Sequence, residues 1–161
     1  MLLAFAFQIV ATLAQIWVHL YYYGYGDMLS YHREGMYLAN LMRDDFVTYG
    51  PDVWRILIQR EPQSSVWVHG IGRSTGSMSA LGGFLTLITF DSLYASCFIV
   101  SFLAFFGLLA LYAGLKTGVP RELHRRLFVA CLFIPSVIFW SSGLQKESVA
   151  VAGMGFATLS L

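Results

Sequence analysis

The stretch FIPSVIFWSSGLQKES, from Phe133 to Ser148, places an acid and a base between two hydrophobic segments. It follows an apolar run, contains Pro135, and passes through a tryptophan and small polar residues before it reaches Lys146 and Glu147. Charged side chains are costly inside a bilayer unless they lie at its edge or in a wet cavity. The pattern therefore predicts that Lys146 and Glu147 lie at the end of a membrane span.

The composition of the whole chain is typical of an integral membrane protein. Of its 161 residues, 57% are hydrophobic and only 12% are charged, whereas soluble domains carry about 25% charged residues. The net charge of +1 gives no reason to expect nucleic acid as a partner, since the basic residues form no continuous stripe. Cys97 and Cys131 lie in apolar runs, where cysteine behaves as a small packing residue, so neither a disulfide nor a metal pair is expected.

Hydrophobic segments divide the chain into spans and loops, because a helix needs about 20 apolar residues to cross a bilayer. No Lys or Arg precedes Arg33, so the first segment lacks the basic start of a signal peptide and is interpreted as a retained span. Gln8, Gln15 and His19 share one face of it, which is expected to pack on protein. The predicted all-α, polytopic fold has spans at about 2–22, 93–115, 127–142 (kinked at Pro135) and 148–161.

The whole of residues 1–161 is interpreted as a single integral membrane domain. Because the last hydrophobic run stops without a polar flank or a helix cap, we expect the chain to be the N-terminal part of a longer protein.

The long segment 23–92 is polar, mixed in charge and built from amphipathic pieces. Apolar residues recur every three or four positions from Asp27 onward, and a second helical piece opens at Gly50-Pro51. Amphipathic helices of this kind lie along a membrane surface. Residues 78–90 are apolar, but a helix of this length extends only about 20 Å, against about 30 Å for the hydrocarbon core. We therefore expect 78–90 to be interfacial or re-entrant.

The basic residues predict the orientation of these loops. Lysine and arginine near span ends resist translocation, so the basic loop 116–126 is expected to be cytoplasmic. If 78–90 does not cross, the loop 23–92 is outside, and Asp27 and Glu147 lie on the same outer side. If it crossed, the two acids would lie on opposite faces. The basic residues of the cytoplasmic loop are Lys116, Arg121, Arg125 and Arg126.

This order of elements resembles the GT-C superfamily of polytopic glycosyltransferases, which transfer sugars from polyprenyl-phosphate carriers at the outer face of a membrane. The likeness rests on a first span ending at Gly26-Asp27, then Tyr31, a large outer loop, a re-entrant-like segment over 76–90 and a second outer loop with Glu147. The run PSVIFWSSGLQKES is similar to bacterial membrane glycosyltransferases related to protein mannosyltransferases and aminoarabinose transferase. The resemblance covers essentially the whole chain and implies a multi-pass enzyme of the cell membrane, the inner membrane in a Gram-negative bacterium.

The resemblance also implies roles for individual residues. Asp27 matches by position the acid that activates or positions the acceptor, and Glu147 matches the acid that supports it or binds metal. Lys146 and Arg73 are candidates for contacts with the phosphate of the carrier. The implied partners are membrane lipid, a polyprenyl-phosphate sugar donor and a glycan, lipid or protein acceptor. The implied catalytic residues are Asp27 and Glu147, and the implied substrate-binding residues are Lys146, Arg73, Tyr31 and His69.

The chain departs from the family pattern in two ways. It has a single Asp where many members have Asp-Glu, and its second outer loop lacks an Asp-x-Asp sequence. The cofactor is therefore left open: the sequence does not require a divalent metal, and no metal ligand is assigned.

Plainer roles remain open for the same residues. Asp27 could cap a helix through Ser30, and Lys146 and Glu147 could be interfacial charges on a short turn. Arg73 could be a solvated loop cation. The alternative function is a non-enzymatic polytopic subunit that packs within a larger membrane complex. Two acids on one side of the membrane favour the enzyme, and the length of 161 residues favours the subunit.

Overall fold

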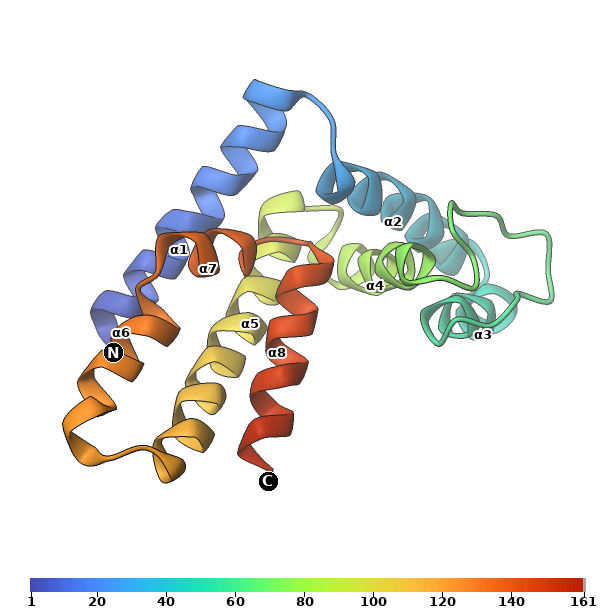
Figure 1. Cartoon of the computed structure of the whole chain (residues 1–161). Coiled ribbons are helices and arrows are strands. Elements are labelled where there is room, and N and C mark those ends of the chain that lie inside the picture. Colours follow the sequence, from blue (N-terminus) through green and yellow to red (C-terminus); the bar gives the residue numbers. More distant parts are fainter. Residues whose placement is uncertain (161) are drawn as a thin grey trace. The chain divides into compact units, whose positions relative to one another are not determined.

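The computed structural model describes residues 1–160, and over these residues it is all-α, with eight α-helices and no strand (Figure 1). The expected all-α class is confirmed. The chain divides into two compact units: unit 1 combines Met1–Val18 with the segment that starts at Cys97, and unit 2 is His19–Ser96. Each unit has its own buried apolar core.

Two helices are long and apolar enough to cross a membrane, judged by length and composition. The first is Leu2–Tyr23, in which α1 (Leu2–Trp17) continues into a π-helical turn, η1 (Val18–Tyr23). The second is Leu93–Gly118, in which α5 (Leu93–Leu115) continues into a short 3-10 turn, η2 (Lys116–Gly118). These helices coincide with the predicted spans 2–22 and 93–115. A buried core helix, or a signal sequence near the N-terminus, has the same length and composition.

The segment predicted as one kinked span, 127–142, is instead interrupted. After the 3-10 turn η3 (Arg121–Leu123), α6 (His124–Leu132) ends, and α7 (Pro135–Trp140) starts as a separate helix. Ile134 between them is extended, with φ −72° and ψ 116°. A proline disfavours helical geometry in the residue before it but is well suited to the first turn of a helix, so the break falls at Ile134. The last helix, α8 (Lys146–Leu159), starts two residues before the predicted 148.

Small residues bring α5 and α8 of unit 1 close together. A Cβ built on Gly155 would overlap the carbonyl oxygen of Gly107, and a Cβ on Gly114 would lie 2.7 Å from the carbonyl oxygen of Thr158. Close approach through small residues is the usual way in which membrane helices pack. A separate apolar core of unit 1 contains the buried residues Ala4, Phe105, Leu108, Cys131 and Leu132.

Unit 2 is built from α2 (Asp27–Asp44), α3 (Phe46–Leu57) and α4 (Ser74–Thr89). The predicted amphipathic face of α2 is confirmed, since Met28, Tyr31, Gly35 and Leu38 are buried. Glycines again bring two helices together: a Cβ on Gly35 would lie 2.6 Å from the carbonyl carbon of Gly82. The segment expected at 78–90 belongs to α4, which packs on α2 and α3. Its position relative to a bilayer stays a prediction.

A buried carboxylate fixes the loop between α3 and α4. Asp52 is only 3% exposed, and its two oxygens accept hydrogen bonds from the backbone N–H groups of Gln63 and Ser64, each at 2.8 Å. Burial by itself would raise the pKa of this carboxyl group, but these hydrogen bonds, with Arg55 nearby, hold the pKa below its ordinary value of 3.8. Asp52 therefore stabilises the loop in its charged form.

The pH dependence of unit 2 follows from the lowered pKa of Asp52. Its contribution is fully present above the pKa of the unfolded chain, about 3.9, and is lost as pH falls through the lower folded pKa. Asp52→Asn should remove this acid-sensitive contribution and reduce the free energy of unfolding at pH 7 by about 1–3 kcal/mol, because one N–H loses its acceptor. Hydrogen exchange of the Gln63 and Ser64 amides should accelerate. Unchanged exchange would contradict this role, and Asp44→Asn serves as the exposed control at pH 7.

Candidate functional site

The first candidate group is a carboxylate at the start of α2, just after the first apolar helix. The chain turns through Gly24 and Gly26, whose φ values of 67° and 136° favour glycine. Asp27 is the first residue of α2 and is exposed. The hydroxyl group of Tyr31, a residue that is only 2% exposed, donates to Oδ2 of Asp27 at 3.1 Å. A buried ring thus holds an exposed carboxylate at a helix N-terminus, where the helix dipole favours negative charge.

The structure corrects the helix-cap interpretation of Asp27. The N-cap residue of α2 is Gly26, and the backbone N–H of Ser30 donates to the carbonyl oxygen of Gly26 at 3.0 Å. A glycine suits this position because His19 packs closely against it: a Cβ on Gly26 would lie 2.9 Å from Cδ2 of His19. Asp27 is therefore not the cap, and its carboxylate is oriented by Tyr31.

Glu34 is a further acid on the same face of α2, and it was not predicted from the sequence. Its Oε1 accepts a hydrogen bond from the backbone N–H of His69 at 3.2 Å, and its Oε2 accepts one from the hydroxyl group of Ser79. The signal in the sequence is the spacing of Asp27, Tyr31 and Glu34 at four and three residues, which places them along one helical stripe. The backbone of His69 thus lies beside Glu34, while the side chain of His69 is exposed.

Arg73 is the N-cap residue of α4 and is exposed. Its backbone N–H donates to the carbonyl oxygen of Gly70 at 3.0 Å. Within residues 1–160, no ion pair joins the guanidinium group of Arg73 to Asp27. The expected phosphate contact of Arg73 stays a prediction.

The second candidate group lies in unit 1, where a buried polar network holds the loop that leads into α8. The side-chain amide of Gln8 donates to Oγ of Ser142 at 3.1 Å and to the carbonyl oxygen of Ser141 at 3.3 Å. The hydroxyl oxygen of Ser101 accepts from Thr12 at 2.9 Å and from the backbone N–H of Gly143 at 2.7 Å. All residues from 141 to 145 are buried. Satisfied buried networks are rigid, so this loop is a fixed platform.

Lys146 and Glu147 form the first turn of α8, directly after this platform. Lys146 is half-buried and Glu147 is exposed. A glutamate in the first turn is favoured by the helix dipole, whereas a lysine there is not. The stretch from Phe133 to Ser148 therefore places the side chains of Lys146 and Glu147 directly after a rigid, buried loop. Asp27 and Glu147 belong to different units, and their expected location on the same outer side of the membrane stays a prediction.

The face of α1 expected to pack on protein is buried, since Gln8 is 1% and Gln15 is 0% exposed. Across the described part of the chain, no group of three or more His, Cys, Asp or Glu side chains is arranged to hold a metal ion. Ionised carboxylates such as those of Asp27, Glu34 and Glu147 accept hydrogen bonds.

No protein-family model, curated protein or solved structure matches this chain. The resemblance to the GT-C superfamily accordingly rests on the order of the elements along the chain and on a few residues, chiefly Asp27, Tyr31 and Glu147. Its functional content is a proposal.

Proposed function

We propose that the chain belongs to a multi-pass membrane glycosyltransferase that transfers a sugar from a polyprenyl-phosphate-linked donor to an acceptor at the outer face of the membrane. The observation that carries the proposal is the hydrogen bond from the buried Tyr31 to the exposed carboxylate of Asp27. This hydrogen bond fixes the carboxylate of Asp27, which can accept a proton, shortly after an apolar helix of 22 residues.

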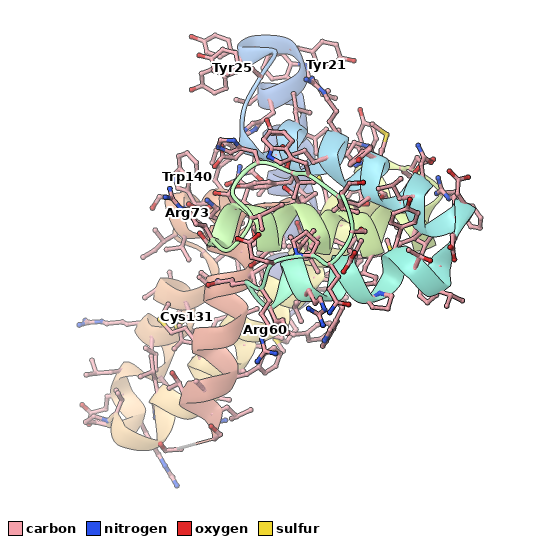
Figure 2. All side chains as sticks on the ribbon, turned by 90° about the vertical axis from the view of Figure 1, so that its right-hand side faces the viewer. Tyr21, Tyr25, Arg60, Arg73, Cys131 and Trp140 are labelled. Atoms are coloured by element: carbon pink, nitrogen blue, oxygen red, sulfur yellow. The ribbon has the colours of Figure 1, made fainter. Side chains whose placement is uncertain are left out.

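Aromatic residues at the end of that helix support placement at a membrane interface. Tyr21, Tyr22, Tyr23 and Tyr25 are 72%, 73%, 52% and 74% exposed. The labelled Tyr21 lies in the last turn of the helix and the labelled Tyr25 follows the helix (Figure 2). The rings of three of them contact one another in sequence, with centroids 5.1 Å apart between Tyr22 and Tyr23 and 6.3 Å apart between Tyr23 and Tyr25. Exposed tyrosine belts are typical of the boundary between lipid and water.

The proposed reaction assigns each charged group a task. The acceptor hydroxyl oxygen attacks the anomeric carbon, the bond from that carbon to the phosphate oxygen breaks, and the phosphate leaves with the electron pair. Asp27 orients the acceptor hydroxyl group and takes its proton. Lys146 and Arg73 stabilise the charge of the leaving phosphate, and Glu147 supports the acceptor side. Tyr31 keeps the carboxylate of Asp27 in one orientation.

A transfer assay tests the proposal. The natural protein is reconstituted in liposomes with polyprenyl-phosphate-linked hexose or pentose, and release of the carrier phosphate is followed together with the labelled product. Transfer that depends on the protein supports the enzyme. A protein that inserts into the bilayer and transfers no sugar from these donors overturns the proposal and favours a non-enzymatic subunit of a membrane complex.

Single-cysteine labelling tests the orientation. In a background with Cys97 and Cys131 replaced by Ala, Glu61→Cys should react with an impermeant thiol reagent from outside, and Thr117→Cys only after permeabilisation. The reason is the basic residues around position 117. Both positions are exposed in the structure, so neither probe is hidden by packing. Labelling of both from the same side would contradict the predicted topology.

A further inference from the structure

Unit 2 contains a cleft that the proposed transfer chemistry does not use. A cavity of about 380 Å³ opens between α2 and the loop that precedes α4. Its volume is within the range of small-molecule sites, about 300–1,000 Å³. The residues that line it are Arg33, Glu34, Tyr37, Trp67 and Val68.

Two aromatic rings border this cleft and are exposed to solvent. Trp67 is 70% exposed and Tyr37 is 45% exposed. The neighbours of Trp67 explain its direction, because Val66 and Val68 are only 4% and 2% exposed and belong to the apolar core of unit 2. The indole of Trp67 lies between these two buried valines in the chain and is turned to solvent. The ring is thus an exposed apolar surface at the edge of the cleft.

The polar side chains of the cleft carry opposite charges. Both oxygens of Glu34 are engaged, by the backbone N–H of His69 and the hydroxyl group of Ser79, so the carboxylate cannot rotate. Each oxygen keeps a lone pair for a further donor. Arg33, beside it on α2, is exposed and offers up to five N–H donors. The carboxylate of Glu34, a fixed hydrogen-bond acceptor, thus lies next to the guanidinium group of Arg33, which can only donate.

This combination selects the class of ligand. A phosphate or carboxylate attracted by Arg33 would also be repelled by Glu34, and an ammonium ion attracted by Glu34 would also be repelled by Arg33, so the two charges offset each other for a ligand with one charge. A neutral molecule that has many hydroxyl groups satisfies both charges, and the polarised C–H groups on one face of a pyranose ring pack well on the negative face of an indole. We infer that this cleft binds a neutral hexopyranose through stacking on Trp67 and Tyr37 and hydrogen bonds to Arg33 and Glu34.

The position of the cleft connects it with the proposed reaction. Glu34 follows Asp27 by seven residues on the same helix, which is a rise of about 10 Å along the axis. A glycan in the cleft would therefore lie within about two sugar rings of the proposed base. This assignment of the cleft to a glycan acceptor rests on the proposed function, whereas binding of the sugar does not.

Fluorine NMR of the protein labelled with fluorotryptophan tests the inference. The protein is kept in a detergent without a sugar headgroup, and methyl glycosides of glucose, mannose, galactose and N-acetylglucosamine are titrated separately. We expect a saturable shift of the Trp67 resonance with at least one glycoside, at a dissociation constant in the millimolar range that is common for single sugars. Trp54, which is exposed in the same unit at 55%, is the internal control and should not shift.

Substitutions distinguish binding in the cleft from binding elsewhere on unit 2. Glu34→Gln and Tyr37→Ala should each weaken the binding about tenfold or more, while Arg60→Gln, an exposed cation of unit 2 outside the cleft, should leave it unchanged. Absence of a saturable Trp67 shift with all four glycosides overturns the inference. Strong broadening of Trp67 by a nitroxide lipid, with no response to sugar, also overturns it and makes Trp67 a membrane-interface residue.

The experiments give different results if the sugar-binding inference is wrong and if the proposed transferase function is wrong. Asp27→Asn should retain the sugar-dependent shift of Trp67, because Asp27 does not line the cleft. If the protein shows this shift but transfers no sugar, the binding site is supported and the transferase function is overturned. If the protein transfers sugar without any shift of Trp67, the transferase function is supported and the binding site is overturned.

Discussion

Replacing Asp27 by Asn is expected to slow sugar transfer by about 10²–10⁴-fold, the range for loss of a general base. The fold should survive, because the N-cap residue of α2 is Gly26 and the hydroxyl group of Tyr31 can donate to the amide oxygen as it does to the carboxylate. Asn has the same shape as Asp but cannot take a proton from the acceptor hydroxyl group. The rate of transfer from a polyprenyl-phosphate-linked donor is the measurement.

The controls for Asp27→Asn use the same chemical change elsewhere. Asp44→Asn, at the exposed end of α2, should leave transfer unchanged. Glu147→Gln should be as damaging as Asp27→Asn if the two acids share the site, whereas Glu122→Gln in the basic loop should be close to neutral. Melting temperatures of all variants must agree, so that lost folding is not counted as lost catalysis. Normal transfer by a well-folded Asp27→Asn protein would remove Asp27 from the reaction.

Lys146→Ala distinguishes a phosphate contact from an interfacial charge. A contact made in both the ground state and the transition state should raise KM for the donor more than it lowers kcat. An interfacial charge would change neither constant. The comparison also bears on the platform at residues 141–145, since this segment positions Lys146 at the start of α8.

Gly155→Ala is expected to destabilise unit 1 by about 3 kcal/mol, at the upper end of the range for overpacking. The added Cβ would overlap the carbonyl oxygen of Gly107 in α5, and the neighbouring atoms that it would meet are backbone atoms. Backbone atoms cannot rotate away as a flexible side chain can, so the two helices would have to separate. The melting temperature of the purified protein and the protease sensitivity of α8 are the measurements.

Gly153→Ala is the matched control on the same helix. A Cβ at Gly153 would meet nothing within 4 Å, so the substitution should be neutral or stabilising by up to about 1 kcal/mol, the difference in helix propensity between Gly and Ala. Gly107→Ala, on the opposite side of the contact, should be as damaging as Gly155→Ala. Equal melting temperatures for Gly155→Ala and Gly153→Ala would show that α5 and α8 do not pack through these glycines.

Features that depend on neighbouring residues along the chain could be predicted from the sequence. The apolar runs at 2–22 and 93–115 predicted the two long helices, because length and composition are sufficient for an apolar helix. The spacing of apolar residues after Asp27 predicted the buried face of α2. The predicted kink at Pro135 is wrong, because the helix ends before Ile134 and restarts at Pro135, although the effect of Pro135 on Ile134 is itself local.

Features that join residues far apart in the chain could not be predicted, because they depend on how the helices pack. The hydroxyl group of Ser101 holds Gly143, Asp52 holds the loop that contains Gln63 and Ser64, and Glu34 lies beside Ser79. Isolated serines and acids give no periodic signal, so their partners appear only when the helices pack. Gly107 and Gly155 look like helix-weakening residues in the sequence, and they become contacts because a missing Cβ lets two backbones approach.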